Sequence, residues 1–310
     1  MVDLVIIGGG PAGVTAGVYA ARKKMKAVLI TDNFGGQSIV SEDIQNWIGI
    51  KSIAGFDLAR DLEDQLRAQK GLEIIDGDLV VKVEKAGEGF AVSTQRGKTI
   101  ETKTILVCSG SGRRKLGVKG EGPLNGKGVA YCSICDAPLF KDKIVAVIGG
   151  GNAGLESVRD LLQYSKKIYL MEFLDVIKGD AVTFENIKKD PKVEVIMSAA
   201  VQEILGDNLV SGLKYQDRKT NEIKELKLDG VFVEIGSTPS ADFLGDLVQK
   251  NQYKEITVDC LTQKTSQEGI WAAGDVSSGL YKQNNIAVGD ACKAVLNIYD
   301  YLSSQDIGKK

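Results

Sequence analysis

The sequence of 310 residues contains no histidine, and this absence narrows the chemistry that the chain can perform. Without an imidazole group, a Ser-His-Asp triad, a Cys-His nucleophile and every histidine-based metal site are excluded. Any proton donor in a catalytic site must therefore be a different side chain.

The chain also lacks long apolar runs and a surplus of charge of either sign. No apolar stretch approaches the length of about 18 residues that a membrane-spanning helix needs. No basic leader precedes the first predicted strand. The formal net charge is −2, with basic and acidic residues interleaved, so no basic surface is predicted for nucleic acid or anionic lipid. We therefore expect a cytoplasmic protein with neither a nucleic acid nor a membrane as its partner.

Cysteine is scarce. The chain has five cysteines, and this odd number fits a reducing compartment better than a secreted disulfide framework. Cys132 and Cys135 form a Cys-x-x-Cys motif, which is the predicted working pair. Cys108 and Cys260 end strand-like runs and Cys292 lies in a predicted helix, so no second pair of zinc ligands is at hand. We expect no metal, and we expect these three cysteines to be core or inert surface residues.

The most informative feature is a glycine signature, G-x-G-x-x-G, that occurs twice. Each copy follows an apolar strand-like run, residues 4–7 or 145–148, and opens a predicted helix. In that context the signature binds the pyrophosphate of a dinucleotide, because glycine permits a tight turn and close backbone approach at a helix N-terminus. Every glycine of the second copy lies 141 positions after its counterpart, and the two sets are Gly8, Gly10 and Gly13, and Gly149, Gly151 and Gly154.

The repeat extends beyond the glycines, because each copy continues with a helix, parallel-type strands and three alternating segments. This order predicts an α/β fold with two Rossmann-like, three-layer ββα dinucleotide-binding domains, each with a three-stranded antiparallel flap. The stretch from Glu255 onward has no glycine signature and is too short for a third domain. We expect residues 1–112 and 246–310 to form the first domain and residues 113–245 to form a second domain inserted into it.

Several element boundaries follow from helical spacing and short apolar β-rich runs. The predicted helices include residues 11–24, 58–68 and 285–302. In the first copy the alternating segments are residues 78–84, 90–94 and 98–102, followed by a closing strand at 105–108. In the second copy they are residues 201–205, 209–216 and 223–228.

In the second copy, Glu172 lies 18 residues after Gly154 at the end of a predicted strand. An acidic residue in this place hydrogen-bonds the ribose 2′-hydroxyl of NAD. Two unit charges about 4 Å apart, at an effective dielectric constant of about 20, repel by about 4 kcal/mol, so the carboxylate disfavours a 2′-phosphate. The site therefore predicts NADH over NADPH, and the alternative is that Glu172 is a solvated residue at a strand end.

In the first copy the same spacing leads to Thr31, with Asp32 next, so the acidic ribose ligand is missing or displaced by one. The surrounding motifs are those that a flavin site needs, namely close backbone approach to the ring and a carboxylate for the ribityl chain. They are Gly35-Gly36-Gln37, Asn46-Trp47 and the distant Gly274-Asp275. We expect FAD here, although a glycine-rich loop alone is more often a simple turn.

The segment around Cys132 and Cys135 fits the start of a helix, where thiolate character is raised. Pro138 is tolerated in a first helical turn, and the acidic Asp136 favours it. A leaving thiolate needs a proton donor, and Asp136, next to Cys135, is the nearest titratable candidate. The alternative is that Asp136 only caps the helix, and the two roles are compatible.

Together these motifs resemble the low-molecular-weight thioredoxin reductase family over essentially the whole chain. The matching motifs are GGGPAG, GGQ, QNW, CSICD, GGGNAG and GD. The resemblance implies a homodimeric FAD enzyme in which NAD(P)H reduces the flavin, the flavin reduces the cysteine pair, and the pair reduces thioredoxin. It also implies that Cys135 faces the flavin, Cys132 exchanges with the partner, Asp136 is the acid/base, and one domain rotates about hinges near Arg113 and Asp246.

One departure from that family concerns the second nucleotide. NADPH-using members carry a basic His-Arg-Arg-x-x-x-Arg run, but in residues 172–178 of this chain only Lys178 is basic. Glu172-Phe173 and the run DAPLF at 136–140 resemble the flavoprotein subunit of alkyl hydroperoxide reductase, which is NADH-linked. That flavoprotein has an additional N-terminal disulfide domain, whereas this sequence starts at the first glycine signature, so we expect the electron acceptor to be a separate protein.

Our hypothesis is an NADH-preferring, FAD-dependent disulfide reductase that acts on thioredoxin or a thioredoxin-like or glutaredoxin-like protein. The alternatives are a thioredoxin reductase driven by ferredoxin or reduced flavin, and a non-catalytic flavin-binding, redox-sensing module. The predicted FAD ligands are Gly8, Gly10, Pro11, Ala12, Gly13, Thr31, Gly36, Gln37, Asn46, Gly110, Gly274, Asp275, Lys282 and Gln283. The predicted NADH ligands are Gly149, Gly151, Asn152, Gly154 and Glu172.

Overall fold

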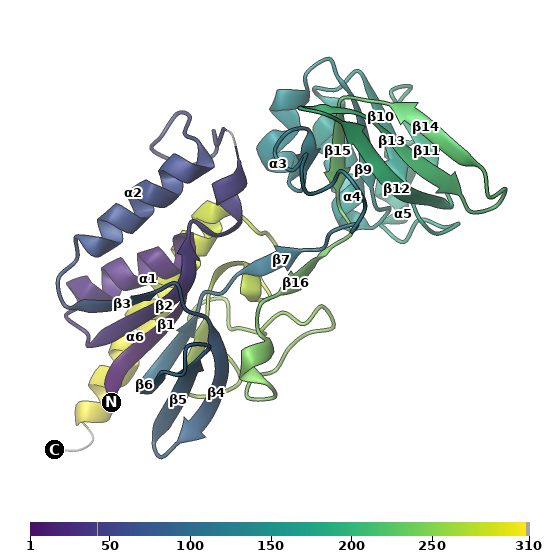
Figure 1. Cartoon of the computed structure of the whole chain (residues 1–310). Coiled ribbons are helices and arrows are strands. Elements are labelled where there is room, and N and C mark those ends of the chain that lie inside the picture. The colour runs from purple at the N-terminus through teal and green to yellow at the C-terminus, as the bar shows by residue number, and fades with distance from the viewer. Residues whose placement is uncertain (42, 308–310) are drawn as a thin grey trace. The chain divides into compact units, whose positions relative to one another are not determined.

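The computed structural model describes residues 1–41 and 43–307. The chain divides into two compact units (Figure 1): unit 1 is Met1–Gly112 with Thr238–Lys310, and unit 2 is Arg113–Ser237. It leaves unit 1 through β7 (Ser111–Arg113) and returns through β16 (Ser237–Pro239), and these strands pair with each other. The return was expected near Asp246, but it lies at Thr238 because Ala241 and Leu244 are buried in the core of unit 1.

The sheet of unit 1 has the strand order β3-β2-β1-β6-β5-β4, with β17 also paired to β6. Segments 98–102 and 105–108, expected as two strands, are one continuous strand, β6. Its first half pairs antiparallel with β5 and its second half pairs parallel with β17, so the flap grows directly out of the main sheet. The strands are β1 (Val2–Gly9), β2 (Ala27–Phe34), β3 (Leu72–Asp76), β4 (Val80–Ala86), β5 (Gly89–Thr94), β6 (Thr99–Val107) and β17 (Ile270–Ala272).

Both faces of the sheet are buried at its central strands, which explains the continuous apolar runs at residues 4–7 in β1 and 27–30 in β2. Along β1, Leu4 and Ile6 contact the helices, whereas Val5 and Ile7 contact the flap and the returning chain. In Figure 1, α1 and α6 lie beside each other; α1 contacts β1 to β3, and α6 contacts β6 and β17. The helices are α1 (Pro11–Arg22), α2 (Gly55–Arg67) and α6 (Asn284–Ile307), with 3-10 turns η1 (Gly36–Val40), η3 (Asp242–Leu244) and η4 (Gly274–Val276).

Unit 2 repeats this plan with a parallel sheet of order β11-β10-β9-β15-β8 and a separate antiparallel sheet of order β12-β13-β14. Along β9, Val145 and Val147 pack beneath the helices, whereas Ala146 and Ile148 face the antiparallel sheet. The strands are β8 (Val129–Ala130), β9 (Ile144–Ile148), β10 (Lys167–Met171), β11 (Val193–Ile196), β12 (Ala199–Gly206), β13 (Val210–Asp217), β14 (Ile223–Lys227) and β15 (Gly230–Val233).

The helices of unit 2 are α3 (Ser133–Asp136), α4 (Asn152–Leu162) and α5 (Ala181–Ile187), with the 3-10 turn η2 (Ala137–Phe140). The sequence analysis did not predict α5. Its local signal is the N-cap Asp180, whose side chain accepts a hydrogen bond from the Thr183 N–H at 2.7 Å. Each unit thus has helices, a parallel sheet and antiparallel strands in layers, which confirms the predicted α/β class.

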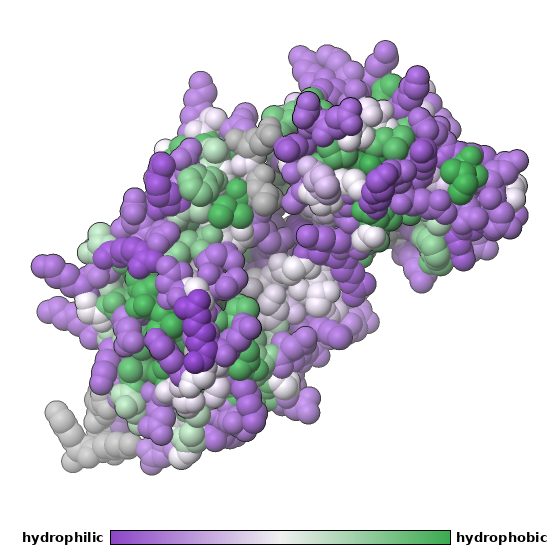
Figure 2. Space-filling model, in the orientation of Figure 1, coloured by the Kyte–Doolittle hydropathy of each residue, from purple (hydrophilic) through white to green (hydrophobic). Residues whose placement is uncertain are grey.

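The visible face of each unit carries mainly hydrophilic side chains (Figure 2). In Figure 2 they cover most of the visible face of each unit, and hydrophobic residues gather only in small groups between them. Among residues 1–41 and 43–307, no helix combines the length and the apolar character needed to cross a bilayer.

Candidate functional site

The first glycine signature forms a tight turn between β1 and α1. Gly8 has a φ of +116°, and a Cβ atom added to it would lie 2.3 Å from the carbonyl oxygen of Cys108. A Cβ atom on Gly13 would lie 1.8 Å from the carbonyl oxygen of Gly8. Gly10 is the N-cap of α1. The first N–H groups of a helix have no partner within the helix, so those of α1 are available to a ligand at this turn. Only glycine fits at Gly8 and Gly13, and the turn places a helix N-terminus where an anionic group can bind.

The second signature reproduces this geometry in unit 2. Gly149 has a φ of +117°, and its added Cβ atom would lie 2.4 Å from the carbonyl oxygen of Glu234. A Cβ atom on Gly154 would lie 1.8 Å from the carbonyl oxygen of Gly149, the same distance as in the first copy. No atom lies within 4 Å of the Cβ position of Gly151, the N-cap of α4. The two turns are structural equivalents, as their constant offset in the sequence predicted.

A cavity of about 940 Å³ opens over the first glycine turn in unit 1. Gly10 and Gly36 approach each other at this cavity, because a Cβ atom on Gly36 would lie only 3.5 Å from the Cα atom of Gly10. This volume is at the upper end of the range for small-molecule sites, as a dinucleotide requires. The predicted ligands that line it are Gly8, Gly10, Pro11, Ala12, Thr31, Gly36, Gln37, Gly110, Gly274 and Asp275.

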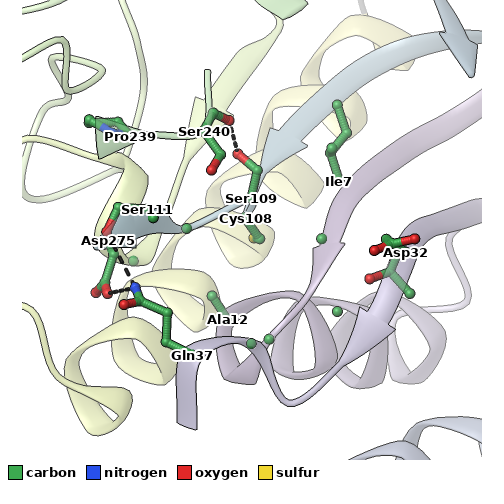
Figure 3. Close-up of a pocket in the computed structure, with 18 of the residues that line it drawn as sticks. Ile7, Ala12, Asp32, Gln37, Cys108, Ser109, Ser111, Pro239, Ser240 and Asp275 are labelled. Carbon is green, nitrogen blue, oxygen red and sulfur yellow. Dashed lines mark hydrogen bonds between the residues drawn. The ribbon is translucent and has the colours of Figure 1, made fainter. Parts of the chain in front are cut away.

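A polar cluster forms one part of this cavity (Figure 3). The side-chain amide of Gln37 donates to Oδ2 of Asp275 and to Oγ of Ser111, each at 3.4 Å. Gly274, which begins the η4 turn, has a φ of +75° and presents Asp275 to the cavity. Asn284, the first residue of α6, also lines the cavity, so a second helix begins there. The cluster offers a carboxylate and amide groups to a polar ligand.

Towards the end of β2, Thr31 and Asp32 both line the cavity but differ in exposure. Thr31 is only 5% exposed, and its hydroxyl donates to the carbonyl oxygen of Asn33 at 2.6 Å. Asp32 is exposed and lines the cavity near the glycine turn (Figure 3). Of these two residues, Asp32 is the one whose side chain is open to a ligand in the cavity.

Four predicted ligands do not line the cavity. Gly13 lies behind the turn against Gly8. Asn46 donates to Oε1 of Gln283 at 3.3 Å, so these two residues join neighbouring loops. The ammonium group of Lys282 pairs with Oε1 of Glu255 at 2.9 Å.

The sequence analysis also missed several residues that line the cavity. Ser109 follows β6 and donates to the carbonyl oxygen of Ser240 at 2.6 Å (Figure 3). The missed segments 78–81 and 238–243 reach the cavity only through long-range folding, and they carry no motif that could have identified them. The missed residues include Asp78, Leu79, Val80, Val81, Ser109, Ser111, Thr238, Pro239, Ser240, Asp242, Phe243 and Asn284.

In unit 2, the carboxylate of Glu172 is fixed at the edge of the second glycine turn. It accepts hydrogen bonds from the N–H of Gly150 at 2.6 Å and from the N–H of Leu174 at 2.9 Å. A Cβ atom on Gly150 would lie 2.8 Å from Oε2 of Glu172, so the glycine lets the carboxylate approach the turn closely. The side chain of Asn152, a predicted NADH ligand, accepts a hydrogen bond from the N–H of Asp180 at 2.8 Å and ties α4 to the loop before α5.

An arginine lies beside this carboxylate-bearing loop. The guanidinium group of Arg218 stacks 3.9 Å from the centroid of the Phe173 ring and donates to the carbonyl oxygen of Phe173 at 2.8 Å. Both contacts hold the cation against Phe173. The sequence analysis did not find Arg218, because it lies at the end of β13 and far from the loop in the sequence.

Cys132 and Cys135 form a disulfide, with their Cα atoms 5.4 Å apart, as predicted for a working pair. Cys132 is the N-cap of the one-turn helix α3, and its carbonyl oxygen accepts from the N–H of Asp136 at 3.0 Å. Ser133 donates to Oδ2 of Asp160 at 2.7 Å, which anchors this turn to α4. The pair therefore lies on a short turn held by the second nucleotide-binding fold.

Asp136 is the ionisable group adjacent to the pair, and most of its surface is buried. Burial raises the pKa of Asp136 from 3.8 to about 6. A general acid or base is most effective when its pKa lies near the working pH. The side chain is therefore suited to exchange a proton with a sulfur atom near neutrality.

The remaining cysteines are not paired. Cys108 is buried at the end of β6, and burial raises the pKa of its thiol, so the reactive thiolate is disfavoured. Cys260 is exposed in a turn rather than at a strand end, and Cys292 is half-buried in α6. In the part of the chain that the structure describes, no three histidine, cysteine or acidic side chains gather as a metal-binding group.

The chain thus contains two equivalent glycine turns and one disulfide. Comparison with known sequences identifies the family of the chain. The sequence profile of the family described as pyridine nucleotide-disulphide oxidoreductase matches residues 2–291. The chain belongs to this family. It is therefore an oxidoreductase, and membership implies a flavin, a pyridine nucleotide and a redox-active disulfide.

Curated relatives resemble nearly all of this chain but are longer. The F subunit of alkyl hydroperoxide reductase from Staphylococcus aureus strain MSSA476 is 38% identical over 300 residues, which are 97% of this chain and 59% of that protein. Its counterpart in Pseudomonas aeruginosa is 40% identical over 97% of this chain and 58% of its own length. A protein named NADH dehydrogenase from Ferdinandcohnia aciditolerans is 38% identical over 97% of this chain and 57% of its own. The chain thus spans less than two thirds of these relatives.

Solved structures match over nearly the full length of both chains. The thioredoxin reductase of Streptococcus pyogenes MGAS5005 has 33% identity and a TM-score of 0.91, covering 98% of this chain and 99% of its own. The thioredoxin reductase of T. acidophilum has 38% identity and a TM-score of 0.66, covering 96% and 98%. These matches confirm the two-domain dinucleotide-binding fold and the resemblance that the sequence motifs indicated.

Proposed function

We propose that the protein is an FAD-dependent disulfide reductase that prefers NADH to NADPH. Electrons pass from the pyridine nucleotide through FAD to the Cys132–Cys135 disulfide, and from there to thioredoxin or a thioredoxin-like or glutaredoxin-like protein. The observation that carries the proposal is the presence of two equivalent dinucleotide cradles and one disulfide in a single chain.

The cavity of unit 1 fits FAD in size and in the groups that line it. Gly10 and Gly36 leave room where side chains would intrude, and Asp32 lies at the ribose end of the glycine turn. Asp275 and Gln37 would hold the ribityl chain, and the N-terminus of α6 at Asn284 would favour negative charge on a reduced flavin ring. Bound FAD would supply the two-electron redox chemistry that links a hydride donor to the reduction of a disulfide.

NADH is favoured by the charge at the second cradle. The two backbone hydrogen bonds of Glu172 fix a negative group where the acidic ribose ligand of a βαβ site lies. Arg218 is a nearby cation, and its guanidinium group is held against Phe173 by a ring contact and a hydrogen bond to the Phe173 carbonyl oxygen. The name NADH dehydrogenase of one relative agrees with this assignment.

The cysteine pair and Asp136 would carry out the chemistry at the disulfide. In this proposal Cys135 receives the electron pair, Cys132 leaves and then attacks the disulfide of the partner, and Asp136 supplies and retrieves the proton of the leaving sulfur. The proposal includes a homodimer and a cytoplasmic location, which stay predictions from the resemblance and the sequence.

A coupled assay of the purified protein tests the proposal. NADH or NADPH is supplied with a candidate acceptor, either thioredoxin or a glutaredoxin-like protein, and new thiols are followed with a thiol-reactive dye. We expect turnover with NADH and a smaller kcat/KM with NADPH. A higher kcat/KM with NADPH would refute the cofactor assignment, and a protein without FAD would refute the function.

The alternatives give different results in the same assay. A reductase driven by ferredoxin or reduced flavin would show turnover only with that donor and none with either nicotinamide. A redox-sensing module would form and lose the disulfide but would not turn over. The intact geometry of the second glycine turn favours the pyridine nucleotide over both alternatives.

A further inference from the structure

Tyr131 lies immediately before the redox pair, and its hydroxyl group makes a contact that the relay described above does not use. The hydroxyl donates to Oε1 of Glu121 at 2.9 Å. Glu121 is only 3% exposed, so the acceptor is shielded from water. Burial, together with the hydrogen bond to Glu121, raises the pKa of Tyr131, so the hydroxyl remains a donor at neutral pH. A buried polar contact thus lies directly beside Cys132 in the chain.

The carboxylate of Glu121 is fixed independently of Tyr131. Its Oε1 atom accepts from the N–H of Leu116 at 2.9 Å, and its Oε2 atom accepts from the N–H of Gly117 at 2.7 Å. The same loop lies against β12, because a Cβ atom on Gly120 would lie 1.9 Å from a backbone carbonyl oxygen of that strand. Glu121 is therefore a well-anchored acceptor for the Tyr131 hydroxyl.

The contact is important because strand pairing ends before the redox pair. In the pairing of β8 with β15, Ala130 is opposite Phe232, and β8 ends at Ala130. Tyr131 follows as a bend, and its side chain packs against the hydrophobic core beneath the antiparallel sheet of unit 2. Beyond Ala130, the ring and the hydroxyl of Tyr131 therefore connect the segment before Cys132 to the rest of the unit.

Cys135 is held by different contacts. The helix α3 that carries it is tied to α4 by the hydrogen bond from Ser133 to Asp160, and Ala137 after it is buried. In the oxidised protein the S–S bond also fixes the two sulfur atoms to each other. After reduction, only the noncovalent contacts of each cysteine keep the two thiols close. Closure of a dithiol becomes more favourable as the effective concentration of its two thiols rises.

We propose that Tyr131 is a positioning residue for the redox pair, and that its hydrogen bond to Glu121 holds Cys132 close to Cys135 in the reduced protein. This inference rests on the proposed role of the pair in disulfide reduction. Loss of the hydrogen bond lowers the effective concentration of the two thiols and makes the disulfide easier to reduce. Tyr131 acts through the placement of Cys132 and exchanges neither electrons nor protons with the sulfur atoms.

The test is the equilibrium of the purified full-length protein with a small dithiol and its cyclic disulfide, without oxygen. The S–S bond of Cys132–Cys135 breaks and two protein thiols form, while the small dithiol gives up two electrons and two protons and closes to a disulfide. Samples are quenched with acid, denatured and alkylated, so that an oxidised chain carries three labels and a reduced chain carries five. No pyridine nucleotide or partner protein is used, so a failure of the proposed electron relay would leave this measurement valid.

We expect Tyr131→Phe to lower the equilibrium constant for disulfide formation about fivefold, which corresponds to about 1 kcal/mol, the usual net contribution of one hydrogen bond. The reduction potential should then be about 20 mV less negative. The variant keeps the ring and the two backbone hydrogen bonds of Glu121, so its fold should be retained. The matched control is Tyr215→Phe, which removes a phenolic hydroxyl from the same core on β13 and should leave the constant unchanged.

The free energy of unfolding of the oxidised and reduced proteins separates positioning from a structural role. Positioning predicts that Tyr131→Phe destabilises the reduced protein more than the oxidised protein, by about 1 kcal/mol. A hydrogen bond of equal strength in both states would destabilise both equally and leave the equilibrium constant unchanged, and that result would overturn the proposal. A larger constant in Tyr131→Phe, or the same decrease in Tyr215→Phe, would overturn it as well.

Discussion

Replacing Glu172 by Gln tests how this chain distinguishes NADH from NADPH. The carboxylate lies at the glycine turn, held by the N–H groups of Gly150 and Leu174. A 2′-phosphate about 4 Å away would be repelled by about 4 kcal/mol per unit-charge pair at an effective dielectric constant of about 20. Glu172 is only half-buried, and solvent and salt screening reduce this to about 2 kcal/mol. Glu172→Gln should therefore lower the NADH-over-NADPH selectivity by about 30-fold.

The assay is the rate of flavin reduction in stopped flow, measured over a range of NADH and NADPH concentrations at two salt concentrations. The selectivity of the wild type should fall with added salt, because the repulsion is electrostatic, and that of Glu172→Gln should not. Glutamine cannot accept both backbone hydrogen bonds with one amide oxygen, so we also expect a loss of about 1–2 kcal/mol in the free energy of unfolding.

Asp175→Asn is the matched control, because it removes an exposed carboxylate three positions along the same loop. It should change the selectivity less than about twofold, since an exposed charge farther from the ligand is screened. An unchanged selectivity in Glu172→Gln, or the same decrease in both variants, would refute the assignment of specificity to this carboxylate.

Two further predictions concern the second glycine turn and the acid beside the disulfide. In Gly149→Ala, unit 2 should unfold at a lower temperature than in the wild type, because the new Cβ atom would lie 2.4 Å from a carbonyl oxygen. Gly151→Ala should keep the wild-type Tm, because the space at its Cβ position is open, but it should bind NADH more weakly in titrations. Equal Tm values would contradict this. Burial raises the pKa of Asp136 from 3.8 to about 6, so protonated Asp136 is favoured in the folded state, and its contribution to stability is present below the unfolded pKa and lost as pH rises through 6. Asp136→Asn should thus raise the free energy of unfolding by about 3 kcal/mol at pH 7 but only by about 0.5 kcal/mol at about pH 4. The same variant should slow disulfide turnover about 100-fold. Denaturation at both pH values measures the two stability changes, and an equal gain at both would contradict the assignment.

The sequence predicted the parts of the site that depend on local pattern. The two glycine turns need strand, glycine and helix in immediate succession, so Gly8, Gly10, Gly149 and Gly151 could be assigned without a structure. The disulfide could be predicted because Cys132 and Cys135 are three residues apart.

The remaining parts of the site depend on contacts between distant segments. Ser240 and Phe243 line the cavity because the returning chain packs beneath the sheet of unit 1, and Arg218 reaches Phe173 from another sheet. Lys282 was predicted to bind flavin from its position near Gln283, but its charge is taken up by Glu255.

The most direct test of the electron relay is a count of thiols during anaerobic reduction by NADH. In the wild type, the flavin absorbance should fall with added NADH, and two new thiols per chain should appear in the absence of any other reductant. In a variant with Cys132→Ser and Cys135→Ser, the flavin should still be reduced, but no new thiols should form and reduction of the partner protein should stop. Full reduction of the partner by this variant would contradict the account.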